Sequence, residues 1–288
     1  MIFLAGGSGY FGSKILASLI KRGGPFINLK RYELGFYSEL SKTVNFFMER
    51  GSGSRNIFIN AAGYTGKPNV DAGEIQKGEC IKGNVGLPVI ISNVCQELNI
   101  PMLHISTGCI YTGHDKIWSE SDPPNFSFRE NNCSFYSGSK ALAEELLETN
   151  EKCYVLRPRI PFDNDIKNPR SFLYKIIQYP KLMNSLNSVT HIEGFTKVLF
   201  RIIDEKLPYG KYNIVCPQPV EIKVLVELLD KYGYIKKEDK KWFASKEEFL
   251  QSVKCPRSEC VLDTKKIEGY GIYMPNSLDT IKKILKHD

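Results

Sequence analysis

The sequence predicts an α/β fold, a doubly wound parallel sheet with a smaller C-terminal lobe. Short apolar strands alternate with amphipathic helices through residue 160, a pattern typical of a parallel sheet covered by helices on both faces. A glycine-rich turn joins the first strand directly to the first helix. Beyond residue 160 the alternation loosens, so we expect one domain over 1–160 and a lobe over 161–288 that is partly interleaved with the sheet.

The first helix has the clearest boundaries. Residues 2–5 are an apolar strand, and residues 10–22 carry apolar side chains at helical spacing before "RGG" provides a glycine cap. The other elements follow from the same periodicities. We expect further strands at 25–29, 55–63, 101–107, 152–159 and 211–217, and further helices at 87–100, 135–149, 223–233 and 277–287.

Composition excludes several classes of function. The 288 residues are 42% hydrophobic and 25% charged, with no apolar run of membrane-spanning length and no basic leader segment. The eight cysteines are scattered and the four histidines isolated, so we expect reduced thiols in the cytoplasm and no metal site. The net charge is +7, but the densest basic run, "IKKEDKK", mixes signs, so we expect neither nucleic acid nor membrane as a partner.

The glycine turn "GGSGYFG" spaces Gly6, Gly9 and Gly12 by two residues each. Glycines in this place let the backbone approach a pyrophosphate, which the helix N-terminus then binds, although a plain strand-to-helix turn has the same appearance. Lys30 and Arg31 follow the second strand, where cations suit the 2′-phosphate of NADP(H). Two solvated surface cations would explain them as well, and nearby Glu33 keeps NAD(H) open.

Tyr136 and Lys140 lie four residues apart near the start of a predicted helix, and therefore on one face. A lysine ammonium beside a phenol should lower the tyrosine pKa from its usual value of about 10. The tyrosine would then exchange a proton with a carbonyl oxygen as hydride is transferred. Such a pair also occurs by chance on surfaces, but Thr107 at the end of the strand "LHIST" supplies a third hydroxyl.

Together the glycine turn, Thr107 and the Tyr–Lys pair resemble the extended short-chain dehydrogenase/reductases. The resemblance implies a Rossmann-like NADP-binding domain over 1–160, with Thr107 on the substrate oxygen, Tyr136 as acid/base and Lys140 tuning it. "NAAG" and Asn84 match that family's third-strand loop and its central-helix asparagine. The implied NADPH contacts are Gly6, Ser8, Gly9, Tyr10, Phe11, Gly12, Arg31, Asn60, Ala61, Ala62, Tyr64, Tyr136 and Lys140.

Cys109 is not needed by a simple reductase. A free cysteine is usually a small core residue, but alternation along an extended segment would place Cys109 on the same side as Thr107. A thiolate there could remove the acidic proton next to a ketone, and Thr107 with Tyr136 would stabilise the enolate. One oxyanion site would then serve both epimerisation and reduction.

Longer stretches are similar to the plant-type nucleotide-rhamnose synthases, which are bifunctional 3,5-epimerase/4-reductases. They include "NAAGYTGKPNVD", "ISTGCIY", "LRPRIPFDNDIKNPRSFLYKII" and "PRSECVLDTKKI". The resemblance implies that Lys175 shares acid/base work with Cys109, and that the substrate-binding residues are Asn84, Thr107, Asn168, Arg170 and Arg257. Ser106 replaces the alanine of the plant pattern "ATGC" and leaves Thr107 intact.

The implied reaction converts UDP-4-keto-6-deoxy-glucose, supplied by a separate 4,6-dehydratase, to UDP-rhamnose with NADPH. A reductase that follows a separate epimerase is one alternative, and Cys109 with Lys175 argues against it. A catalytically silent regulatory subunit is another, against which the intact Tyr136 and Lys140 argue. The choice of UDP over dTDP and the formation of a homodimer stay open.

Overall fold

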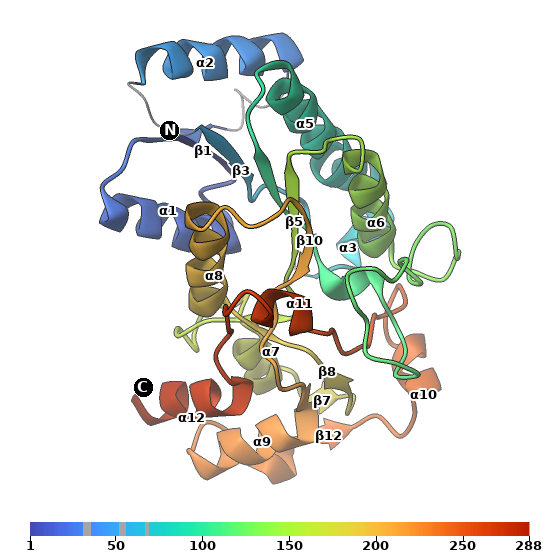
Figure 1. The fold of residues 1–288 in the computed structure, drawn as a ribbon. Coiled ribbons are helices and arrows are strands. Elements are labelled where there is room, and N and C mark those ends of the chain that lie inside the picture. Colours follow the sequence, from blue (N-terminus) through green and yellow to red (C-terminus); the bar gives the residue numbers. More distant parts are fainter. Residues whose placement is uncertain (31–35, 52–55, 67–68, 288) are drawn as a thin grey trace.

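A computed structural model describes residues 1–30, 36–51, 56–66 and 69–287 (Figure 1). Its centre is a six-stranded sheet in the order β10-β5-β4-β3-β1-β2, in which every neighbouring pair is parallel. The strands are β1 (Ile2–Ala5), β2 (Phe26–Leu29), β3 (Ile57–Asn60), β4 (Met102–Ile105), β5 (Cys153–Arg157) and β10 (Gly210–Asn213). The predicted doubly wound parallel α/β fold is thus confirmed.

Helices cover both faces of this sheet (Figure 1). One face carries α1 (Tyr10–Arg22) and α8 (Ile192–Asp204), and the other α2 (Tyr37–Arg50), α5 (Leu87–Glu97) and α6 (Phe135–Leu147). Successive strand residues point to opposite faces, so Leu4 joins the core under α1 and α8 whereas Phe3 joins the core under α2 and α5. Both side chains are fully buried.

The first helix has the bounds that its sequence predicts. Gly9 is its N-cap, and Gly23 ends it in the left-handed conformation with φ 70°, donating its N–H to the carbonyls of Leu19 and Ile20. This conformation suits glycine, which has no Cβ to clash with the backbone.

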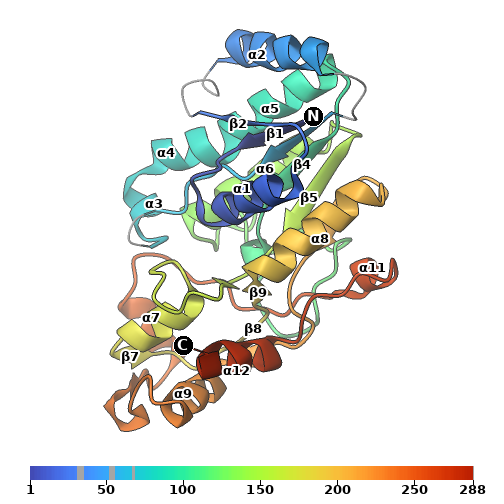
Figure 2. The same cartoon turned by 90° about the vertical axis from the view of Figure 1, so that its left-hand side faces the viewer.

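The lobe groups α7, α9 and α12 beneath the sheet domain (Figure 2). Its elements are β6 (Pro161–Phe162), α7 (Phe172–Gln178), β7 (Lys181–Leu182), β8 (Leu186–Asn187), β9 (Thr190–His191), β11 (Val220–Glu221), α9 (Ile222–Lys231), a 3₁₀ turn (Lys237–Asp239), β12 (Lys241–Trp242), α10 (Lys246–Gln251), α11 (Lys265–Glu268) and α12 (Ser277–His287). Between β9 and β11 the chain returns to the sheet for α8 and β10. The chain therefore connects the lobe to the sheet domain at several places.

Several helices have no counterpart among the predicted elements. Among them are α2, α8, α7, α10, α11, α3 (Ala72–Ile75), α4 (Lys77–Ile81) and a π-helical turn (Lys82–Gly86) that leads into α5. The helical spacing of apolar residues in "IEGFTKVLFRIID" could have revealed α8.

No helix in the described ranges is long and apolar enough to cross a membrane. No group of three His, Cys, Asp or Glu residues in those ranges could hold a metal ion. All eight cysteines are free thiols.

Candidate active site

The glycine turn packs tightly against the loop that follows β3. Gly6 has φ 83°, and a Cβ on it would lie 2.5 Å from the Ala62 backbone nitrogen, while a Cβ on Gly12 would overlap the Gly6 carbonyl oxygen. Gly9 gives α1 no side-chain cap, and the first turn of α1 holds no acidic residue. The uncapped N–H groups and the positive end of the helix dipole therefore fit a dinucleotide pyrophosphate.

Two predicted cofactor residues turn their side chains away from this turn. The Phe11 ring packs edge-on against Phe195 of α8, with centroids 4.9 Å apart. The Tyr10 hydroxyl is buried near Asp163 and Ser171, and burial raises its pKa. Tyr10 and Phe11 can therefore bind a cofactor only through their backbone N–H groups. Ser8 is exposed and can also contact it. Arg31 lies outside the described residues, and Lys30 directly follows β2.

Asn84 fixes the loop after β3. Its side-chain oxygen accepts from the Tyr64 N–H at 2.7 Å, and its amide nitrogen donates to the Tyr64 carbonyl at 2.8 Å and to Ser139 Oγ at 3.0 Å. The Asn84 side chain is almost fully buried, so it joins the loop that carries Ala61, Ala62 and Tyr64 to α6. Its predicted contact with the substrate stays a prediction.

Thr107, Cys109 and Tyr136 meet beyond the end of β4. Thr107 caps a 3₁₀ turn (Gly108–Ile110), its hydroxyl accepting from the Cys109 N–H at 3.1 Å. The Tyr136 hydroxyl, in the first turn of α6, is hydrogen-bonded to Thr107 and lies near Cys109. The prediction that strand-like alternation continues through this stretch is wrong, because the 3₁₀ turn replaces the extended backbone. Cys109 nevertheless faces the site.

Lys140 is not directed toward Tyr136 in this structure. Its ammonium is buried, 3.0 Å from the Ile105 carbonyl and 3.1 Å from His104 Nε2. Burial and the nearby Cys109 raise the Tyr136 pKa, against the hydrogen bond from Thr107. The expectation that Lys140 lowers the Tyr136 pKa is therefore wrong for this arrangement of side chains.

A buried chain of polar contacts links Asn60, His104 and Lys140. Asn60 accepts from the Ala62 N–H, so its amide nitrogen faces His104 Nδ1 at 3.1 Å. The other ring nitrogen, Nε2, faces Lys140 at 3.1 Å. Burial lowers the Lys140 pKa to about 8, so the side chain is still mainly an ammonium at pH 7.

Lys175 and Arg170 approach the site from the lobe. Lys175 lies on α7, and its pKa is lowered by burial and by Arg170 and raised by the nearby Cys109. The influence of Cys109 on Lys175 is consistent with their closeness, and the predicted acid/base pair stays a prediction. Asn168 shapes its own loop, donating to Asp163 Oδ2 at 3.0 Å and accepting from the Arg170 N–H at 3.0 Å.

Arg257 is already paired within the protein. Its guanidinium lies 2.8 Å from Asp71 Oδ1 and donates to the Cys255 carbonyl, also at 2.8 Å. This ion pair joins the lobe to the segment before α3. A diphosphate would have to replace Asp71 or share the guanidinium with it.

Arg159 is a site residue that sequence analysis missed. Its Nη1 lies 3.5 Å from Cys109 Sγ, and its side chain is almost fully buried. The available signal was the second arginine of "LRPR", placed just beyond a strand whose end faces the site.

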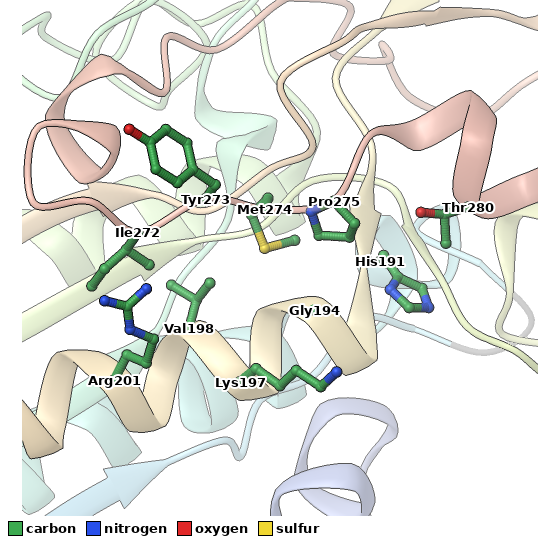
Figure 3. A pocket seen from close by; sticks show the side chains of 10 residues that line it. All are labelled: His191, Gly194, Lys197, Val198, Arg201, Ile272, Tyr273, Met274, Pro275 and Thr280. Atoms are coloured by element: carbon green, nitrogen blue, oxygen red, sulfur yellow. The ribbon is translucent and has the colours of Figure 1, made fainter.

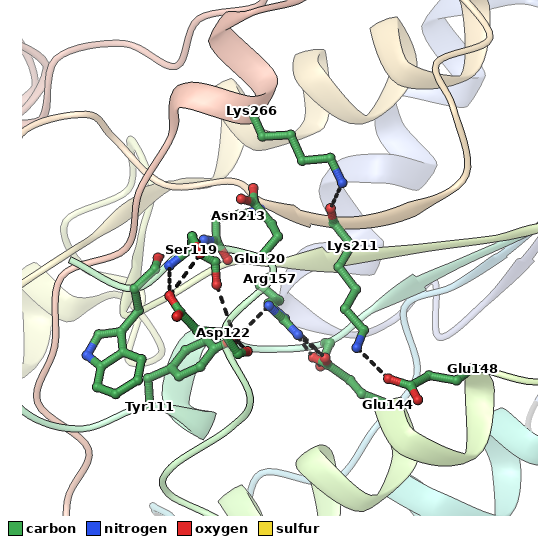
Figure 4. A network of polar contacts seen from close by, with 12 residues as sticks. Tyr111, Ser119, Glu120, Asp122, Glu144, Glu148, Arg157, Lys211, Asn213 and Lys266 are labelled. Atoms are coloured by element: carbon green, nitrogen blue, oxygen red, sulfur yellow. Dashed lines mark hydrogen bonds and ion pairs between the residues drawn. The ribbon is translucent and has the colours of Figure 1, made fainter. Parts of the chain in front are cut away.

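Behind the site, Glu144 and Arg157 form a buried ion pair (Figure 4). Arg157 Nη2 lies 2.6 Å from Glu144 Oε2, and Arg157 Nη1 lies 2.8 Å from the Tyr111 hydroxyl. Ser106 donates to the other Glu144 oxygen. Since Ser106 precedes Thr107 and Glu144 follows Lys140 by one turn, this pair holds two catalytic elements together.

Glu144→Gln should destabilise the protein by about 3–5 kcal/mol, because Arg157 would be left as a buried charge without its partner. The free energy of unfolding in urea measures the effect. Glu145→Gln is the matched control, since its partner Arg129 has a side chain 75% exposed and the variant should change stability little. Equal stability of the two variants would contradict this account of the network.

A hollow of about 530 Å³ lies elsewhere, between α8 and the segment before α12 (Figure 3). Met274 and Pro275 lie over Gly194 of α8, and Arg201 extends toward Ile272. None of the predicted site residues lines this hollow. The groups with chemistry converge instead at the ends of β4 and β5.

Comparison with known proteins agrees with this architecture. Residues 1–195 match the family of RmlD substrate-binding domains. The chain is 35% identical over 217 residues, 73% of its length, to the trifunctional UDP-glucose 4,6-dehydratase/UDP-4-keto-6-deoxy-D-glucose 3,5-epimerase/UDP-4-keto-L-rhamnose-reductase of Arabidopsis thaliana. The match spans 31% of that much longer protein.

Solved structures extend the similarity to the whole chain. The L780 UDP-rhamnose synthase of Acanthamoeba polyphaga mimivirus has a TM-score of 0.86 at 25% identity, covering 99% of this chain and 98% of that one. A dTDP-4-dehydrorhamnose reductase of Bacillus anthracis, in complex with NADP, shares the fold with a TM-score of 0.79 at 14% identity, covering 100% of this chain and 98% of that one. The chain belongs to the family of RmlD substrate-binding domains.

Proposed function

We propose that the chain converts UDP-4-keto-6-deoxy-D-glucose to UDP-L-rhamnose by 3,5-epimerisation and NADPH-dependent reduction of the C4 ketone. The observation that carries the proposal is the turn in which the Thr107 hydroxyl accepts from the Cys109 N–H, with Tyr136 and Lys175 near enough for Cys109 to raise their pKa values. The names of the plant and viral relatives support it. The substrate would come from a 4,6-dehydratase in the same compartment, which we take to be the cytoplasm.

Reduction needs a proton donor at the C4 oxygen. The Tyr136 hydroxyl is held by Thr107, and burial keeps it protonated at neutral pH. Both hydroxyls would hydrogen-bond the ketone oxygen, and Tyr136 would give it a proton as negative charge develops. NADPH, held by the glycine turn, supplies the hydride when bound.

Epimerisation needs a base on one face of the sugar and an acid on the other. Cys109 would take the proton from C3 or C5, and the electron pair of that C–H bond would move to the C4 oxygen, where Thr107 and Tyr136 stabilise the enolate. Lys175 would return a proton to the opposite face. No oxidant or reductant is consumed in this step.

A reductase without epimerase activity is the second candidate. Reduction requires neither Cys109 nor Lys175, and the plant relative carries its three activities on a chain of which the match covers 31%. A catalytically silent subunit is less well supported because Thr107 and Tyr136 are already hydrogen-bonded to one another.

The test offers the purified protein two sugars with NADPH. The bifunctional enzyme oxidises NADPH with UDP-4-keto-6-deoxy-D-glucose as well as with the already epimerised UDP-4-keto-L-rhamnose. Oxidation with the epimerised sugar alone would identify a reductase. Binding of NADPH without oxidation in either case would favour the silent subunit.

Cofactor preference gives a separate prediction. Lys30 and Arg31 should favour NADPH over NADH by binding the 2′-phosphate, so replacing both with alanine should narrow the preference by about tenfold for each charge-assisted bond lost. Dissociation constants of both cofactors measure the effect, with Lys21→Ala on α1 as a control for the loss of a surface charge. Equal affinity of the unmodified protein for the two cofactors would contradict the prediction.

A further inference from the structure

Three hydrogen bonds to two segments of the chain hold the Arg159 side chain in place. Its guanidinium donates to Ser258 Oγ at 2.7 Å, to the Ser258 carbonyl at 2.9 Å and to the Asn187 side-chain oxygen. The next residue, Ile160, has φ 39°. A β-branched residue in this conformation is strained, so the surrounding structure holds the backbone here against its preference.

The guanidinium is directed at Cys109. Nη1 lies 3.5 Å from Cys109 Sγ and 3.4 Å from the Gly108 carbonyl, within the turn that Thr107 caps. Cys109 also raises the pKa of the half-buried Lys175 on α7, against the lowering by burial and Arg170. Among the described residues, Tyr136 and Cys260 are also ionisable groups on which Cys109 acts.

The charge of Arg159 has no acidic partner in the described part of the chain. Its contacts there are a hydroxyl, two carbonyls, an amide oxygen and the thiol, all neutral. Arg157, two residues earlier and equally buried, is neutralised by Glu144. A buried cation without an anion is costly, and a thiolate at Cys109 would supply that anion.

We propose that Arg159 holds Cys109 as the thiolate that removes the C3 and C5 protons, which makes Arg159 a positioning residue for epimerisation. This inference rests on the proposed function. The thiolate gains the carbon-bound proton and becomes a thiol, while the electron pair of the C–H bond moves into the enolate. Arg159 exchanges no proton and stabilises the starting thiolate.

Alkylation of Cys109 tests the charge effect without any substrate. Iodoacetamide reacts with the thiolate, so its rate at each cysteine, followed by mass spectrometry across pH, reports how readily that thiol ionises. We expect Arg159→Met to slow alkylation of Cys109 by at least about tenfold near neutral pH, as expected for loss of an adjacent opposite charge. Arg159→Lys should lie between this variant and the unmodified protein.

The pH profile separates charge from packing. Loss of the charge moves the half-maximal rate at Cys109 to higher pH, whereas a change in access alters the rate equally at every pH. Cys133, half-buried before α6, is the internal reference and should react unchanged. An unshifted Cys109 profile in both variants would overturn the proposal, and if Arg159→Met fails to fold, Arg159→Lys decides alone.

Solvent exchange keeps the two proposals distinguishable. Without NADPH, the unmodified protein should introduce deuterium from D₂O into C3 and C5 of UDP-4-keto-6-deoxy-D-glucose, and Arg159→Met should slow this exchange as it slows alkylation. An unmodified protein that exchanges nothing would refute epimerisation and the role of Arg159 in it. The alkylation profiles would then still decide whether Arg159 stabilises the thiolate.

Discussion

Tyr136→Phe should lower the rate of NADPH oxidation with UDP-4-keto-L-rhamnose by about 100-fold or more. The variant keeps the ring but removes the hydroxyl that Thr107 holds, and general acid catalysis is typically worth a factor of this size. Stopped-flow absorbance of NADPH under single-turnover conditions measures the reduction step itself.

The control for this variant is Tyr273→Phe. Tyr273 is 68% exposed and lies beside the hollow at α8, so its loss should leave the rate unchanged. Near-normal reduction by Tyr136→Phe would assign the proton to another donor, and Thr107 would be the first to test.

Cys109→Ser should abolish epimerisation while preserving reduction. The C4 ketone accepts the electron pair in both reactions, so the two share Thr107 and Tyr136 but differ in the need for a base. A serine hydroxyl carries almost no anion at neutral pH, so it cannot replace a thiolate. The variant should oxidise NADPH with UDP-4-keto-L-rhamnose but not with UDP-4-keto-6-deoxy-D-glucose.

Neighbouring variants sharpen this result. Cys133→Ser, a half-buried thiol outside the site, should behave as the unmodified protein. Lys175→Ala should lose inversion but retain part of the solvent exchange from the Cys109 side. Thr107→Val should impair both activities, because the shared oxygen loses a donor. Normal epimerisation by Cys109→Ser would return this cysteine to a packing role.

Much of the fold follows from local pattern. The apolar runs that predict β3, β4 and β5 are buried along their whole length, and α1 was predictable to the residue because glycines mark both of its ends. The helix α2 was not predicted, although apolar Leu40 and Val44 bury one face of it. The π-helical turn before α5 depends on Asn84 packing into Tyr64 and Ser139, which no local spacing encodes.

The site was predictable as a set of residues but not as a network. Thr107, Cys109 and Tyr136 converge because parallel strands end at one edge, and this follows from topology. Lys140 contacts His104 of β4, and His104 in turn contacts Asn60 of β3. These three residues are far apart in the sequence, so local pattern does not predict their contacts. The place of Arg159 in the site could not be predicted from the sequence, because its partners Asn187 and Ser258 are remote in the chain.

The central claim is that one ketone site performs both reactions. The most direct test is the configuration and deuterium content of the product made in D₂O. The unmodified protein, given UDP-4-keto-6-deoxy-D-glucose and NADPH in D₂O, should yield UDP-L-rhamnose with deuterium at C3 and C5, as read by proton NMR. Cys109→Ser should yield no UDP-L-rhamnose. A reduced 6-deoxy sugar that keeps the gluco configuration at C3 and C5, with protium at both carbons, would show reduction without epimerisation and contradict the account.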